Sequence, residues 1–159
     1  MVEDELTSQI IDKEAYKTKL AKKYTTFLAQ YPEIFADLIS GSQFDFAIYN
    51  SIESYDARSP IDVFNVYRNN EGIEIKPGKA NNPDLELALS VQAIEKLIKT
   101  KDKVEYTQLL GSFYNEPNEQ NGWIDFMLFK RTQKIIEMGY GKFAQTAGIL
   151  ADDGSIINL

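Results

Sequence analysis

The side chains able to do chemistry in this sequence are few in kind, because it contains no histidine and no cysteine. Disulfides, thiolate nucleophiles, zinc sites built on Cys or His, and His-based catalytic triads are therefore excluded. Carboxylates, lysine, tyrosine, serine and threonine remain as possible catalytic groups. Because none of them stands in a catalytic motif, we expect no enzyme and no cofactor, and an enzyme that uses carboxylates and tyrosines is the least favoured alternative.

Arg131 is the most conspicuous charged residue, because it interrupts an expected apolar stripe. We predict a helix from Gly122 to Gly139 with Asn121 as its cap. The apolar stripe of that helix consists of Ile124, Met127, Leu128, Ile135 and Met138. A charge within such a stripe needs a partner or must reach water along its aliphatic stem. Arg131 is therefore interpreted either as a bidentate partner of a ligand carboxylate or phosphate, or as half of a structural ion pair.

Two acidic groups and one glycine-containing segment have residue types that occur in ligand sites. Glu53 and Asp56 share one polar segment, Asp152-Asp153 lies near residue 159, and carboxylates at such spacing can bind calcium or magnesium. Neither group fits an EF-hand, so no metal site is expected. The segment 139–142 lacks the Walker spacing and follows a predicted helix rather than a strand, which argues against a phosphate loop.

The clearest element signal lies between Asn82 and Thr100, where a predicted strand passes into a helix with almost no loop. Leu85, Leu87 and Leu89 alternate with other residues, which is typical of a strand. The period then changes to that of a helix, and Ser90 stands at the N-cap position. The apolar face of this helix consists of Val91, Ile94, Leu97 and Ile98.

Similar patterns predict the remaining elements. Alternation indicates strands at residues 43–50, 63–68 and 73–77, the last two forming a hairpin. Helices are expected from Asp12 and from Pro32, a loop at 51–60, and a short helix at 101–110 followed by a short strand from Gly111. The prediction is an α+β fold, a mostly antiparallel sheet of about five strands covered by helices. It forms one domain over residues 1–159, with loosely structured tails at 1–11 and 144–159.

Charge and hydropathy restrict the partners and the location. The chain has 17 basic and 24 acidic residues, a net charge of −7, so nucleic acid is not an expected partner. No apolar run approaches the roughly 20 residues that span a bilayer, and no export signal is visible, so a cytoplasmic location is expected. A local basic patch is predicted to contact an anionic membrane transiently, or else to be an ordinary solvated helix face. It consists of Lys13, Lys17, Lys19, Lys22 and Lys23.

The segment GIEIKPGKANNPDLELALSVQAIEKLIKT resembles the sterol carrier protein type-two domain. Its matching pieces are Gly78-Lys79-Ala80, the alternating strand 85–89 and the helix capped by Ser90, and the likeness extends over about residues 40–113. The resemblance implies non-covalent binding, and possible transfer, of a fatty acid, acyl-CoA or other lipid in a tunnel between sheet and helices.

The resemblance also implies which side chains line such a tunnel, with core packing as the alternative role for each of them. They are Phe44, Phe46, Phe64, Val66, Leu87, Leu97, Ile98, Leu110, Phe113, Trp123 and Met127. Arg131 is the candidate partner of the lipid head group, with a structural ion pair as its alternative role. A different class of function stays open as well: a protein-interaction or dimerisation module with an aromatic core and no ligand.

Overall fold

A five-stranded mixed sheet forms the centre of the structure, a computed structural model that describes residues 16–149. The strands are β1 (Gln43–Tyr49), β2 (Asp62–Arg68), β3 (Ile73–Pro77), β4 (Leu85–Ser90) and β5 (Ile124–Leu128). They lie in the order β3-β2-β1-β4-β5. β1 and β4 are parallel and the other neighbouring pairs are antiparallel, which confirms the predicted α+β fold with a mostly antiparallel sheet.

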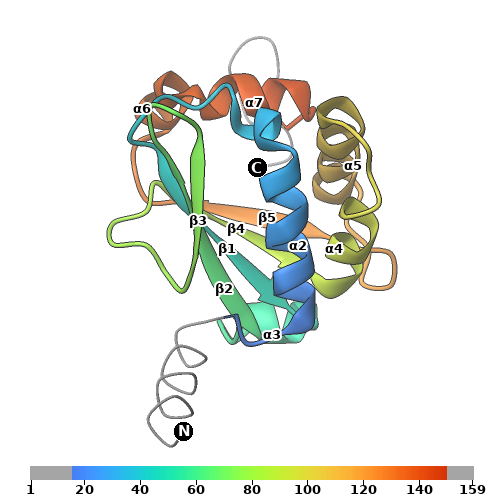
Figure 1. Cartoon of the computed structure of the whole chain (residues 1–159). Coiled ribbons are helices and arrows are strands. Elements are labelled where there is room, and N and C mark those ends of the chain that lie inside the picture. The colour runs from blue at the N-terminus through green and yellow to red at the C-terminus, as the bar shows by residue number, and fades with distance from the viewer. Residues whose placement is uncertain (1–15, 150–159) are drawn as a thin grey trace, which may run out of the picture.

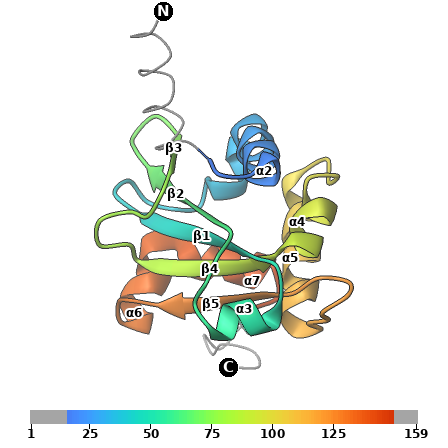
Figure 2. The same ribbon diagram turned by 90° about the horizontal axis from the view of Figure 1, so that it is seen from below.

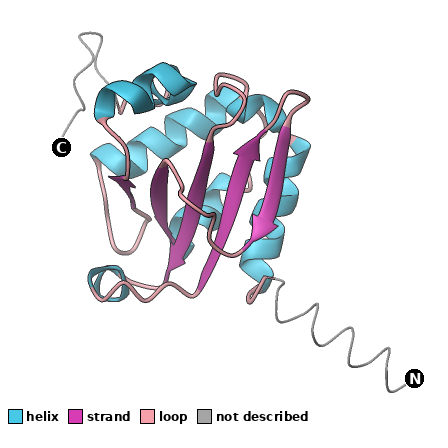
Figure 3. Cartoon of the chain, turned by 90° about the vertical axis from the view of Figure 1, so that its left-hand side faces the viewer, coloured by secondary structure: helices cyan, strands magenta, loops and turns pink. Residues whose placement is uncertain are grey.

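Helices cover one face of this sheet, as Figures 1 and 3 show. They are α2 (Lys19–Gln30), the 3-10 helix η1 (Pro32–Phe35), α4 (Val91–Leu97), α5 (Lys103–Asn115), α6 (Thr132–Ile135), the π-helical turn η2 (Ile136–Tyr140) and α7 (Gly141–Thr146). The short helix α3 (Ile52–Asp56) lies on the opposite side of the sheet, in front of it in Figure 2.

The alternation of the strands divides their side chains between the two faces. Phe46 and Phe64 point to the helical side, where Tyr24 of α2 meets their rings edge-on at centroid distances of 5.5 and 5.7 Å. On the other face, Tyr49 and Trp123 pack with Tyr55 of α3 in a small second cluster. Helix α3 thus protects aromatic surface that the main group of helices does not reach.

Two helices, α4 and α2, begin at residues whose side chains cap the first turn, and the cap of α4 is the one that the sequence predicts. The Ser90 hydroxyl accepts a hydrogen bond from the Ala93 N–H at 3.1 Å, which confirms Ser90 as its N-cap. Helix α2 is capped by Thr18, whose hydroxyl accepts from the Ala21 N–H. Asp12, the cap expected from the sequence, lies outside the described residues.

Two predictions about connecting segments are wrong. Residues 51–60 contain α3, which begins with reciprocal hydrogen bonds between Ser51 and Ser54. Residues 103–115 form one continuous helix, so the strand expected from Gly111 does not exist. The reason for a glycine here is close packing, because a Cβ at Gly111 would lie 1.5 Å from the backbone oxygen of Ala147.

The predicted helix from Gly122 to Gly139 is also wrong. Its first part is the edge strand β5, and helical structure begins only at Thr132. Gly139 has a φ of +100°, and a Cβ there would lie 2.0 Å from the backbone oxygen of Asp37. This glycine therefore both turns the chain and lets it approach the turn that follows η1. The tail expected from residue 144 begins inside α7, and Ala147 and Ile149 beyond it are buried.

Candidate functional site

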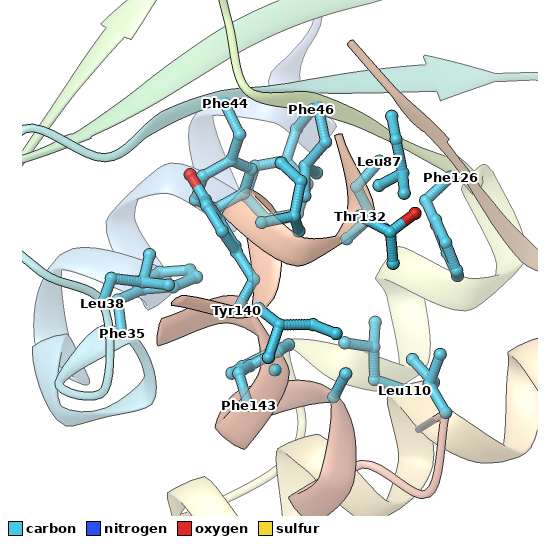
Figure 4. Close-up of a pocket in the computed structure, with 17 residues that line it drawn as sticks. Phe35, Leu38, Phe44, Phe46, Leu87, Leu110, Phe126, Thr132, Tyr140 and Phe143 are labelled. Carbon is cyan, nitrogen blue, oxygen red and sulfur yellow. The ribbon is translucent and has the colours of Figure 1, made fainter. Parts of the chain in front are cut away.

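An apolar cavity of about 90 Å³ lies between the sheet and the segment α6–η2–α7. Figure 4 shows side chains from the sheet on one side of it and from the C-terminal helices on the other. Among its lining residues, Thr132 and Tyr140 carry the polar side-chain groups, both of them hydroxyls. The lining residues are Phe35, Leu38, Phe44, Phe46, Leu85, Leu87, Leu110, Phe126, Leu128, Thr132, Ile135, Ile136, Tyr140, Gly141, Phe143, Ala144 and Ile149.

Strand alternation and the C-terminal helices together create this wall. Phe44 and Phe46 of β1, Leu87 of β4 and Phe126 of β5 all project from the helical face of the sheet. Phe126 pairs in register with Leu87, which continues the apolar surface to the edge strand. Leu110 of α5 closes one side, and α6–η2–α7 covers the side of the cavity that faces away from the sheet.

Only some of the side chains expected from the sequence meet here. Phe44, Phe46, Leu87 and Leu110 lie in the wall of the cavity. The others are outside it: Phe64, Val66, Leu97, Ile98 and Phe113 belong to or pack against the main core.

The remaining three expected residues are separated from the cavity by the sheet or by the chain path. Trp123 lies in the second cluster on the opposite face. Met127 alternates with the wall residues Phe126 and Leu128, so it projects from the face opposite to theirs. Arg131 is exposed and precedes α6, so the apolar stripe in which it was expected does not form.

The wall residues that the sequence reasoning missed come mainly from two segments. Phe35 and Leu38 belong to η1 and the turn after it, and Ile135, Tyr140 and Phe143 belong to the covering segment. The alternation of Ile124, Phe126 and Leu128 was a usable signal for a strand. It was overlooked because the same residues also fit a helical stripe.

A buried carboxylate, Asp84, ties this covering segment to the sheet. Its side chain is 0% exposed and receives the Tyr140 hydroxyl at 2.8 Å and the Gln43 N–H at 2.9 Å. Lys130, which follows β5, forms an ion pair with its other oxygen. Asp84 therefore has the partners that a buried charge requires, drawn from β1, from the end of β5 and from η2.

Tyr140 acts in this cluster as a neutral donor. Burial raises the pKa of its phenol far above the ordinary value, and the hydrogen bond to Asp84 and the negative charge of Asp84 raise this pKa further. The phenol does not ionise near neutral pH, so the bond from Tyr140 to Asp84 persists there.

Two further groups hold the cover. Asp37, in the turn after η1, pairs with Lys103 of α5 at 2.9 Å and with Lys142 of α7 at 3.6 Å. Desolvation opposes ionisation of Asp37, but the bonds and charges of the two lysines outweigh it and keep its pKa below the ordinary value. The Met138 carbonyl accepts from the Ile39 N–H at 2.9 Å. The cover is thus joined to the body by a small number of polar contacts.

A second buried polar pair lies away from the cavity. The hydroxyls of Tyr24 and Tyr106 are 2.5 Å apart and join α2 to α5. Burial raises the pKa of each tyrosine, so both remain protonated. This pair satisfies two phenols in the core and presents no nucleophile.

The acidic groups singled out in the sequence form no metal site among the described residues, and the described lysines of the basic patch are exposed. Within residues 16–149 no three acidic side chains lie together as a possible metal site; Glu53 and Asp56 lie on α3, and Asp152-Asp153 falls outside the described residues. Lys17, Lys19, Lys22 and Lys23 are exposed at the start of α2 or along it, and Lys13 also falls outside the described residues. No described helix has the length and apolar character required to cross a bilayer.

Comparison of the chain with protein-family models, with curated proteins and with solved structures finds no match.

Proposed function

We propose that this protein binds a lipid or another apolar molecule non-covalently in the cavity beneath α6–η2–α7. The observation that carries the proposal is the cavity itself, because its wall is built from aliphatic and aromatic side chains of both the sheet and its cover. Ligand sites are mostly apolar with a few polar groups, and here Thr132 is an exposed hydroxyl residue at the wall. Binding and release, without bond chemistry, form the mechanism.

In this proposal the small cavity belongs to a closed state of the protein. A volume of about 90 Å³ is smaller than the roughly 150 Å³ of an engineered apolar cavity that holds benzene. An acyl chain therefore enters only when part of the wall moves. Each methylene that it buries contributes about 0.8 kcal/mol, so roughly ten carbons provide useful affinity.

The covering segment α6–η2–α7 is the part of the wall best suited to move. It consists of three short elements, and its middle element is a π-helical turn that contains the left-handed Gly139. Side-chain contacts from Tyr140 to Asp84 and from Lys142 to Asp37 join it to the body. Opening of this segment would expose the apolar wall, as lid motions do in other ligand-binding proteins.

The resemblance to the sterol carrier protein type-two domain supports the same ligand class. It implies a lipid tunnel between sheet and helices, and the cavity lies between those two layers. A fatty acid, acyl-CoA or similar lipid is therefore the proposed ligand, and we propose a cytoplasmic location. Lys19, Lys22 and Lys23 form an exposed row on α2 that we propose meets anionic membrane, at about 1 kcal/mol per charge.

A pair of neighbouring substitutions on α7 tests the cavity. Ala144→Phe places a large ring into the cavity, whereas Gln145→Phe places the same ring on the exposed side of the helix. If the ring excludes about three methylenes of a fluorescent fatty acid, binding weakens by about 2.4 kcal/mol, or roughly fiftyfold. Equal binding by both folded variants and the parent would refute the proposal.

The alternative of an interaction or dimerisation module gains no specific support from the surface. The large apolar side chains that are well exposed come from four separate segments: Ile39 from the turn after η1, Ile52 from α3, Val104 from α5 and Phe129 from the chain just after β5. Single exposed apolar residues are ordinary on protein surfaces. Sedimentation that shows a stable dimer, together with an absence of bound lipid, would favour this alternative.

A further inference from the structure

An open cleft of about 820 Å³ lies beside α3, which Figure 1 shows at the end of the sheet opposite α6. Its lining includes four basic side chains, Lys17, Arg58, Lys76 and Lys79, and one carboxylate, Asp62. None of the residues of the apolar cavity lines it. The chain as a whole carries a net charge of −7, so this concentration of positive charge runs against the composition.

The single carboxylate of the cleft is already bonded to neutral groups. Asp62 accepts hydrogen bonds from the backbone N–H of Lys17 at 2.8 Å, of Thr18 at 3.1 Å and of Val63 at 2.9 Å. Its acceptor sites are therefore largely occupied by the chain before α2, while its negative charge remains in the cleft beside the basic side chains. Among the described residues, Lys17, Arg58 and Lys79 form no salt bridge.

The backbone of Arg58 has a left-handed conformation, which glycine adopts more readily than arginine. Its φ is +56°, and it follows α3 at the position where a helix commonly ends in a left-handed glycine. The N–H of Arg58 bonds to the Tyr55 carbonyl at 3.0 Å and that of Ser59 to the Ser54 carbonyl at 2.9 Å, which closes the helix end. Glycine would satisfy this turn without the steric strain that a side chain brings.

The Arg58 side chain is held in one direction despite its exposure. Its guanidinium carbon lies 4.8 Å from the centre of the Tyr55 ring, within the range of a cation–π contact. Stacking on a ring occupies the face of the guanidinium, and the hydroxyls of Tyr49 and Tyr55 and the charge of Glu86 also interact with it. The two tyrosines hold the guanidinium beside the cleft, where it presents its positive charge and its remaining N–H groups to an anion.

We propose that this cleft binds the phosphate group of a phosphorylated compound. A guanidinium fork suits two phosphate oxygens, and the ammonium groups of Lys17 and Lys79 add point charges that match a doubly charged anion. Lys76 contributes less, because it pairs with the exposed Glu74 at 3.7 Å. The phosphate belongs either to a soluble metabolite or to a phospholipid head group, since the two share this chemistry.

Substitutions at two cleft positions test the proposal. Arg58→Gly removes the guanidinium and suits the left-handed backbone, so the fold is retained. Lys79→Gln removes one charge, and Lys99→Gln, on an exposed residue after α4, is the control with the same change in net charge. Backbone amide shifts of the isotope-labelled full chain are followed during titration with inorganic phosphate and with glycerol phosphate. Co-sedimentation is measured with phosphatidylcholine vesicles with and without phosphatidic acid.

The expected result is saturable shifts at Arg58, Ser59, Lys76, Gly78 and Lys79. The Kd is expected to rise roughly tenfold for R58G and K79Q but not for K99Q. A soluble ligand is indicated if glycerol phosphate gives this pattern and vesicles do not. A head group is indicated if phosphatidic acid vesicles bind through Arg58 and glycerol phosphate does not. Absence of both, or equal weakening by K99Q, overturns the proposal, and neither result bears on the apolar cavity.

Discussion

The bond from Tyr140 to Asp84 gives the sharpest test of how the cover is held. Tyr140→Phe removes one hydroxyl and leaves the ring in the cavity wall. Asp84 is 0% exposed, so water cannot easily replace the lost donor at 2.8 Å. In the variant, Asp84 keeps its ion pair with Lys130 and its hydrogen bond from the Gln43 N–H. The carboxylate therefore loses one partner but remains paired.

The expected cost follows from the kind of bond that is lost. A hydrogen bond to a charged group contributes about 1.5–3 kcal/mol to stability. Because the donor here is a neutral phenol, we expect Tyr140→Phe to lower the free energy of unfolding by about 2 kcal/mol. For a chain of this length that loss lowers Tm by roughly 4–8 °C. Because the bond joins cover and body, we also expect faster amide exchange in α7 and faster release of a bound fatty acid.

Urea unfolding, hydrogen exchange and stopped-flow release measure these three effects. Tyr67→Phe is the matched control, because within the described residues its hydroxyl has no hydrogen-bond partner. A Tyr140→Phe protein as stable as the Tyr67→Phe protein would refute the role given to this bond. A loss of stability without faster exchange in α7 would refute its assignment to the cover.

Two more predictions concern packing and pH. Gly111→Ala is expected to destabilise the fold by about 1–3 kcal/mol in urea unfolding, because its Cβ would collide with the Ala147 carbonyl at 1.5 Å. Gly72→Ala, which has open space around it, is the control, and equal losses would contradict the packing argument. Ionised Asp37 has a lowered pKa when folded, so its contribution is complete above the ordinary carboxyl pKa and is lost as pH falls through the lowered value. Unfolding measured from pH 7 to pH 3 should therefore show a smaller acid-induced loss for Asp37→Asn, and an unchanged profile would contradict the pairing with Lys103.

Apart from α3, the described fold up to the end of α4 follows closely from local patterns. Leu85, Leu87 and Leu89 alternate, and Ser90 caps the next helix, because strand pleating and capping act between neighbours in the chain. The hairpin of β2 and β3 is set in the same way by turn residues between two alternating runs. Such signals need no knowledge of tertiary contacts.

The last third was misread because one set of residues satisfies two periods. Ile124 and Leu128 are four apart and suit a helical face, yet with Phe126 they also alternate as a strand. Hydrogen bonding to β4 selects the strand over the helix, and β4 is distant from these residues in the sequence. The sequence predicts that the helix ends before Gly111 for a similar reason, since only the close approach of Ala147 explains a glycine at this position.

The candidate site shows the same division. Phe44, Phe46 and Leu87 were predictable as wall residues because strand alternation sends them to one face. The cluster around Asp84 was not, because Lys130 lies 46 positions away and Tyr140 lies 56 positions away. Contacts of that kind are determined by how the cover docks, and the sequence pattern carries no signal for it.

The most direct test of the central claim is native mass spectrometry of the parent chain purified without added lipid. We predict adducts with the mass of a fatty acid, acyl-CoA or similar lipid, recovered by solvent extraction and reduced in the Ala144→Phe protein but not in the Gln145→Phe protein. A parent protein that carries no such adduct and also fails to take up a fatty acid after delipidation would contradict the claim.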